Sequence, residues 1–197
     1  RPLLSEDMRE FYAFCEAEAI PLCWHVNLSK FSGEFTQVLL EYPKLKIILP
    51  HFGVGFYTPG GKTMQDLAQI LDNYPNVYVD SSFGTRDILV AGLERVSGAV
   101  PIFRDFYLRY QDRIIFGTDM VVTGNREKTP AWISSVIRAC RDMHEKETYQ
   151  FWMAADGAPY ATNRGNPYGV FKGLNLPEDV LRKVYGENLE RLLSKPE

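Results

Sequence analysis

The sequence contains 197 residues, of which 45% are hydrophobic and 13% aromatic, and its formal net charge is -3. This composition is typical of a globular protein with a sizeable core, and the mild acidity argues against nucleic-acid binding, which usually requires a basic patch. All apolar runs are much shorter than the roughly 20 residues needed to cross a membrane, and the N-terminal segment lacks a signal-peptide core, so we expect a cytoplasmic protein without membrane contact.

Helix and strand signals alternate along the chain. The helices show apolar residues at positions 0, 3, 4 and 7, and capping residues such as Ser5 and Thr129 precede them. The strands are short aliphatic runs. In chain order we expect a helix around 8–15, a strand at 20–26, a helix around 35–42, a strand at 46–51, a helix around 64–71, a strand at 77–81, a helical region interrupted near 98–101, a strand at 112–120, a helix around 133–140 and a last helix at 177–193.

This alternation predicts an α/β fold. Strands that alternate with helices form parallel sheets through right-handed crossovers. The strands are apolar throughout, which is typical of a sheet covered on both faces. Residues 150–176 are rich in Gly, Pro, Asn and aromatic residues. We interpret them as an irregular insertion within a single domain spanning 1–197.

Polar residues occur where the expected strands end. His25, His51 and Asp119 each follow an aliphatic run, and Ser81 ends another. In parallel βα folds, functional groups gather at the carboxyl ends of strands. A single histidine there is more often structural, but two histidines and an aspartate at equivalent positions favour a site. We therefore expect these three side chains to converge as metal ligands or proton-transfer groups.

Several neighbouring residues are open to two interpretations. Asp80 either belongs to this site or caps the segment that follows it, and the cap is favoured. His144 lies among charged residues, which indicates a solvated helix end. Aromatic residues beside the site suit an aromatic or unsaturated acid, although packing is their commoner role: Trp24, Phe52, Phe56, Tyr57 and Phe83. The candidate substrate-binding residues are Trp24, Asn27, Phe52 and Ser81.

The ordered segments PLCWHVN, KIILPHFG, YPNVYVDSS, RIIFGTDM and VYGENLERLL, between about residues 5 and 195, resemble the second half of a known family. This is the amidohydrolase-related family of metal-dependent TIM barrels, which includes aminocarboxymuconate-semialdehyde decarboxylase. The resemblance implies strands five to eight of a (β/α)8 barrel. It implies that His25 is a metal ligand and that Asp119 is a ligand or general base. His51 would bind metal, the reactive water or substrate, and Zn²⁺ is the expected ion.

The sequence departs from this family in one respect. The family carries a His-x-His pair at the end of its first strand, and this sequence contains none. A whole barrel needs about 250 residues, whereas the four βα units account for the length here. We therefore expect an N-terminal barrel half or a second chain to complete the barrel, with a homo-oligomer as a further option.

The resemblance implies a metal-dependent hydrolase or a non-oxidative decarboxylase, which is a lyase. Its substrate would be a small carboxylic acid, aromatic or unsaturated. The alternative is a catalytically incomplete half-barrel that acts as a binding or assembly module, and the missing His-x-His pair favours this alternative.

Overall fold

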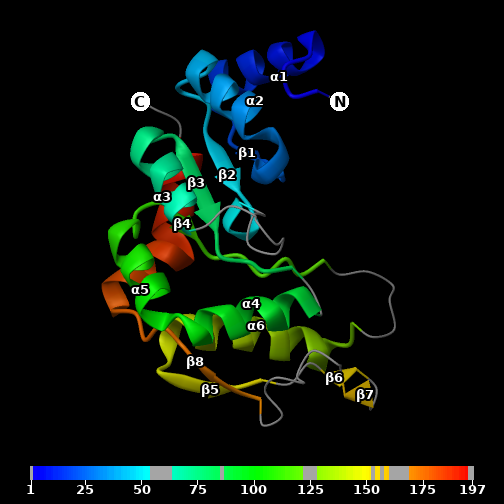
Figure 1. Ribbon diagram of the computed structural model, residues 1–197, viewed down its shortest axis with the longest axis vertical. Helices are drawn as coiled ribbons and strands as arrows, with labels where there is room; N and C mark the ends of the chain where they lie inside the picture. The colour runs from blue at the N-terminus through cyan, green and yellow to red at the C-terminus, as the bar shows by residue number, and fades with distance from the viewer. Residues whose placement is uncertain are drawn as a thin grey trace. The chain divides into compact units, whose positions relative to one another are not determined.

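The computed structural model describes residues 2–53, 64–84, 87–121, 128–151, 154–155, 158–159 and 169–194 (Figure 1). The chain divides into two compact units. The first comprises Arg1–Ser81, Tyr110–Phe116 and Lys183–Glu197, and the second comprises Ser82–Arg109 and Gly117–Arg182.

The first unit contains the parallel sheet. Its strands are β1 (Leu22–Cys23), β2 (Ile47–Leu49), β3 (Val77–Asp80) and β4 (Ile114–Ile115). Among the described residues the order is β1-β2-β3-β4, and each neighbouring pair is parallel. The α/β prediction with parallel strands is confirmed. The strands are shorter than the sequence indicates, because the apolar runs continue beyond the paired residues.

Helices flank this sheet within the first unit. They are α1 (Glu6–Ala17), α2 (Leu28–Glu41), α3 (Met64–Asn73) and α8 (Asn188–Leu193), with a 3-10 turn η1 (His51–Gly53) and a π-helical turn η4 (Lys183–Glu187). Ser5 occupies the predicted N-cap position of α1, but its side chain makes no capping hydrogen bond. The apolar faces of α1 and α2 bury Tyr12, Phe35 and Val38. These three residues belong to the apolar helix faces that the sequence predicted, and they contribute to the core.

The two faces of the sheet differ in burial. Along β2 and β3, the side chains of Ile47, Leu49, Val77 and Val79 are fully buried. The alternate residues Ile48, Tyr78 and Asp80 are half-buried, and Cys23 at the same level of β1 is exposed. Successive side chains of a strand point to opposite faces, so one face forms the core and the other is partly open. This partly open face differs from the prediction that both faces of the sheet are covered.

The second unit is mainly helical. Its helices are α4 (Asp87–Gly98), α5 (Val100–Arg109), α6 (Pro130–Glu145) and α7 (Glu178–Arg182). Two antiparallel pairs join β5 (Thr148–Gln150) to β8 (Val170–Lys172) and β6 (Ala154–Ala155) to β7 (Ala158–Pro159). The hydroxyl oxygen of Thr129 accepts the N–H of Trp132 at 3.2 Å, so the predicted cap of α6 is confirmed. Parts of the 150–176 stretch thus form short strands.

Phe83 illustrates the packing of the second unit. Its ring is buried against α4, where a Cβ added to Gly92 would lie 2.4 Å from the ring carbon Cγ. Glycine at this helical position therefore permits the close approach of the aromatic ring. This contact is a packing role for Phe83, one of the aromatic residues that the sequence placed beside the site.

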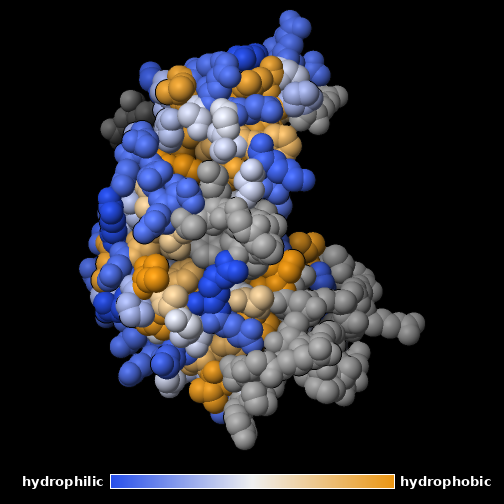
Figure 2. Space-filling model, viewed as in Figure 1, coloured by the Kyte–Doolittle hydropathy of each residue, from blue (hydrophilic) through white to orange (hydrophobic). Residues whose placement is uncertain are grey.

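The surfaces of both units carry apolar side chains among polar ones (Figure 2). On α1, Phe11 is 46% and Phe14 57% exposed, and Leu40 on α2 is 67% exposed. None of the helices in the described ranges has the length and apolar character needed to span a bilayer.

His144 is fully buried, so the expectation of a solvated helix end is wrong. Its Nδ1 lies 2.7 Å from the carbonyl oxygen of Cys140, which can only accept a hydrogen bond, so Nδ1 carries the proton. Nε2 then accepts the hydroxyl proton of Tyr107 at 2.8 Å. His144 continues the buried row of Val136 and Cys140 at four-residue spacing. Burial lowers the pKa of His144 to about 4, although the Cys140 carbonyl and Glu145 oppose this shift.

We expect His144 to make folding sensitive to pH between about 6.5 and 4. The folded state keeps the ring neutral in this range, whereas the unfolded chain takes up a proton. The unfolded state binds more protons here, so the free energy of unfolding falls as the pH falls. The full difference in pKa corresponds to roughly 3 kcal/mol. Urea unfolding at a series of pH values measures this dependence.

The variant His144→Gln removes the titrating ring and should reduce the pH dependence of the free energy of unfolding over this range. Ser135→Ala changes an exposed, non-titrating residue of the same helix and serves as the control, with the wild-type slope expected. The same slope in His144→Gln as in the wild type would contradict the assignment.

Candidate functional site

Two histidines and an aspartate lie at the carboxyl ends of three neighbouring strands in the first unit. His25 follows β1, His51 follows β2, and Asp80 is the last residue of β3. Because β1, β2 and β3 are adjacent and parallel, these residues share one edge of the sheet. Functional groups gather at this edge in parallel βα folds.

The structure brings the imidazole rings of His25 and His51 together. Their centroids are 5.3 Å apart, and the ring planes meet at 72°. His25 is exposed and His51 is half-buried, so the pair has access to solvent. Two imidazoles in contact can bind one ion jointly or hold the same polar group between them.

Trp24, the residue that precedes His25, is held by aromatic contacts. Its ring packs against Tyr12 of α1 with centroids 5.2 Å apart and against Phe35 of α2 at 5.6 Å. These contacts tie the end of β1 to α1 and α2 just before His25. Substrate contact by Trp24 stays a prediction.

The backbone at His51 adopts an unusual conformation. His51 and Phe52 have φ values of 55° and 48°, and Gly53 follows with 79°. This left-handed region costs residues other than glycine about 1–2 kcal/mol each. Phe52 is 2% exposed, and the N–H of Gly53 donates to the carbonyl of Pro50 at 3.0 Å. Core packing and a tight turn therefore hold a strained segment at a candidate functional residue.

Asp80 contacts this strained turn across the sheet. Its Oδ1 accepts the backbone N–H of His51 at 3.0 Å. The sequence indicated a cap for the following segment or a polar group of the site, but not this contact. The sequence contained no local signal for this contact, because it depends on the register between β2 and β3.

The remaining candidates of the first unit have identifiable structural contacts. The side chain of Asn27 accepts the N–H of Ser29 at 3.0 Å and caps α2. Ser81 is 1% exposed, and its N–H donates to the carbonyl of Ile115 at 2.9 Å. Phe52 lies in the core below the turn. Substrate-binding roles for these three residues stay predictions.

Asp119 belongs to the second unit and follows β4 in sequence. It is half-buried, and its φ of 50° is again left-handed. Its carbonyl accepts the N–H of Val121 at 3.1 Å, and its Oδ2 lies 3.7 Å from the position of a Cβ added to Gly84. Glycine at position 84 therefore leaves room beside the carboxylate. The convergence of Asp119 with the histidine pair stays a prediction.

Phe56 and Tyr57, which the sequence placed beside the site, lie outside the described residues.

Some of the side chains at the sheet edge are suitable ligands for an ion such as Zn²⁺. Although the Cys23 residue is exposed overall, desolvation of its thiol and the charge of Asp80 raise the pKa of that thiol and so disfavour the thiolate that would bind a metal. Imidazole and carboxylate groups remain as donors. Within the described ranges, no group of three or more His, Cys, Asp or Glu residues is arranged to hold a metal. The histidine pair supplies fewer than the three protein ligands of a catalytic zinc site.

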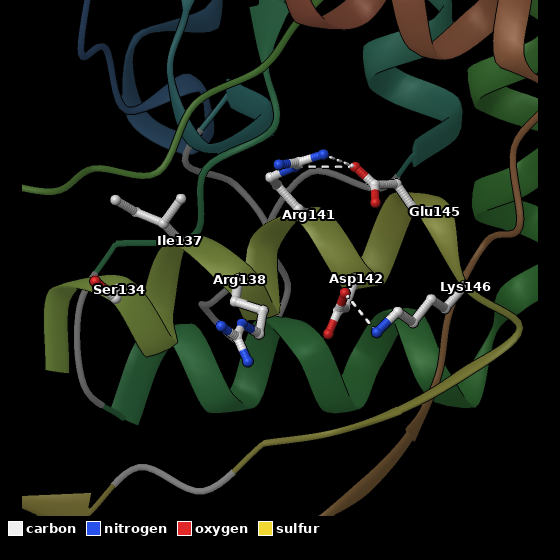
Figure 3. Close-up of a pocket in the computed structure, with 7 residues that line it drawn as sticks. All are labelled: Ser134, Ile137, Arg138, Arg141, Asp142, Glu145 and Lys146. Carbon is white, nitrogen blue, oxygen red and sulfur yellow. Dashed lines mark hydrogen bonds and ion pairs between the residues drawn. The ribbon is translucent and has the colours of Figure 1, made fainter. Parts of the chain in front are cut away.

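A surface hollow on α6 provides a contrast to this edge (Figure 3). Arg141 is directed to Glu145, with a distance of 2.8 Å between Nη2 and Oε1, and Lys146 to Asp142, with 3.0 Å between Nζ and Oδ1. Both are pairs at four-residue spacing on a helix, which contribute little to stability and leave their charges matched. We interpret the hollow as an ordinary charged helix face.

Comparisons with known proteins agree with this architecture. Residues 1–195 match the amidohydrolase family. The fold resembles that of an uncharacterised TIM-barrel protein from Bordetella bronchiseptica, with 18% sequence identity and a TM-score of 0.52. The match covers 98% of this chain and 52% of that protein, so the chain spans about half the length of that barrel protein. Among curated proteins, none matches the chain.

The conformation of Gly53 yields a prediction for the first unit. A Cβ at this position would lie 3.0 Å from Cδ1 of the buried Leu28, and its φ is 79°. Gly53→Ala should therefore lower the free energy of unfolding by about 1–3 kcal/mol through backbone strain and overpacking. Urea unfolding measures the change.

Gly33→Ala in α2 is the matched control. A Cβ there meets no atom within 4 Å, so alanine should stabilise the helix by up to about 1 kcal/mol. Equal effects of the two substitutions would show that the turn at Gly53 is not constrained as described.

Proposed function

Because this chain belongs to the amidohydrolase family, we propose that it forms part of the active site of a metal-dependent hydrolase or non-oxidative decarboxylase. The proposed substrate is a small carboxylic acid, aromatic or unsaturated. The contact between the imidazoles of His25 and His51, at the carboxyl edge of the sheet, carries this proposal. Exposed His25 and half-buried His51 leave that edge accessible.

In this proposal His25 and Asp119 bind the metal together with a His-x-His pair supplied by an N-terminal barrel half or a second chain. Imidazole and carboxylate donors with one position left open are the ligands of catalytic zinc sites. When bound, the ion would polarise a carboxylate or carbonyl group and lower the pKa of a nearby water. The proposal of a second barrel half is supported by the comparison of lengths, since the match covers 52% of a TIM-barrel protein.

The proton chemistry is assigned to Asp119 and His51. In hydrolysis Asp119 accepts the proton of the attacking water, while His51 stabilises the negative charge that develops on the substrate oxygen. In decarboxylation Asp119 or His51 delivers a proton to the carbon that loses CO₂. The assignment is supported by the contact between the His51 ring and the ring of His25, a proposed ligand.

The test uses the complete protein, including the His-x-His half, and a panel of aromatic and unsaturated carboxylic acids with their amides and lactones. Release of CO₂ and hydrolysis are scored separately. Asp119→Asn should abolish turnover with the fold intact, because asparagine lacks both the charge and the basicity of the carboxylate. His51→Asn should reduce turnover about 10²–10⁴-fold if His51 acts in proton transfer or orientation.

Asp112→Asn is the control, because this carboxylate pairs with Lys183 at 2.9 Å and its side chain is 59% exposed. It should retain wild-type turnover. A metal count on each variant assigns His51: loss of both metal and all turnover would make it a ligand. Wild-type turnover in Asp119→Asn would overturn the mechanism. Absence of turnover on the whole panel by the complete wild-type protein would instead favour a binding or assembly module.

A further inference from the structure

We propose that Asp80 is a positioning residue whose carboxylate holds the backbone of His51 and thereby sets the His51 imidazole against that of His25. The inference rests on the proposed function only where it treats this pair as catalytic. Its observations are one hydrogen bond, one strained turn and one ring contact, all within the first unit.

The contact follows from the register of β2 and β3. Leu49 pairs with Val79, so the next position on β2 is Pro50 and the next on β3 is Asp80. In a parallel pair the residues of one strand that bond to a given neighbour alternate, and on β2 the N–H of Ile47 donates to the carbonyl of Asn76 before β3. His51 follows Ile47 by four positions, so its N–H also faces β3, which ends at Asp80. This N–H needs an acceptor, because buried or partly buried backbone donors are almost always paired. The Asp80 carboxylate supplies that acceptor at 3.0 Å.

A carboxylate is a stronger acceptor at this position than the backbone carbonyl of an ordinary ladder bond. The turn from Pro50 to Gly53 takes His51 and Phe52 into the left-handed region. Such turns usually contain glycine, asparagine or aspartate, for which this conformation costs little. Hydrogen bonds to an ionised acceptor are roughly twice as strong as neutral ones. Asp80 thus favours the strained turn over an extended continuation of β2.

The backbone contact bears on the imidazole through the geometry of the turn. Phe52 is buried and Gly53 closes the turn, so the segment is held after His51. Asp80 holds it at His51 itself. With both points fixed, the Cα–Cβ direction of His51 is set, and its ring lies 5.3 Å from that of His25. Loss of the Asp80 hydrogen bond would release the backbone at His51.

A direct chemical role of the Asp80 charge makes a different prediction. Asparagine keeps an oxygen that can accept the N–H of His51, but it carries no charge. A positioning role therefore survives Asp80→Asn in large part and fails in Asp80→Ala. A role as metal ligand or proton carrier fails in both variants.

The experiment compares the full chain with Asp80→Ala, Asp80→Asn and Asp112→Ala by nuclear magnetic resonance of isotope-labelled protein. Two quantities are measured: the exchange rate of the His51 amide, and the nuclear Overhauser effect between the rings of His25 and His51. Asp112→Ala removes a carboxylate of the same unit that pairs with Lys183 instead. In Asp80→Ala the amide should exchange about 10- to 100-fold faster and the ring contact should weaken.

Asp80→Asn should keep the ring contact and most of the amide protection, and Asp112→Ala should match the wild type in both. Wild-type values in Asp80→Ala would overturn the inference, and so would an Asp80→Asn variant that behaves as Asp80→Ala does. Neither measurement requires turnover. A protein without the proposed activity can therefore still meet these expectations, which separates failure of the inference from failure of the proposed function.

Discussion

The parallel register of β1, β2 and β3 is the constraint on which the candidate site depends. Leu22 pairs with Ile47, and Ile47 pairs with Val77, so three strand ends lie at one edge of the sheet. This arrangement brings His25 and His51 into contact although 26 residues separate them in sequence. A shift of one residue in any strand would exchange its buried and open faces. The fully buried Ile47, Leu49, Val77 and Val79 therefore stabilise the register and, with it, the edge.

The turn after β2 shows how a favourable core supports an unfavourable local conformation. His51 and Phe52 adopt left-handed backbone angles that they would avoid in isolation. Burial of Phe52 contributes roughly 1.5–3 kcal/mol, which is sufficient to offset much of this cost. Asp119, the other proposed catalytic residue, is also left-handed. Strain at both residues is consistent with side-chain directions that a relaxed strand end would not provide.

The second unit depends on a different interaction, the buried contact between Tyr107 and His144. The hydroxyl and both ring nitrogens are satisfied, so polar groups lie in the core of α5 and α6 without an unpaired charge. In the first unit, β1 and β4 are the edges of the described sheet. Edge strands carry backbone groups that further strands can pair with. This agrees with a chain that spans about half of a TIM-barrel protein.

The sequence by itself determined the α/β class, the order of the helices and strands of the parallel sheet, and the cap of α6 at Thr129, because spacing and capping are local signals. It also placed His25 and His51 at strand ends. It did not predict the short strands β5 to β8. Only the tertiary structure decided that Asp80 binds the His51 backbone, since this contact depends on the register between two strands. The burial of His144 was decided in the same way. Its charged neighbours in sequence suggest solvent, but a helix turns by about 100° per residue, and packing against Tyr107 selects which face is buried.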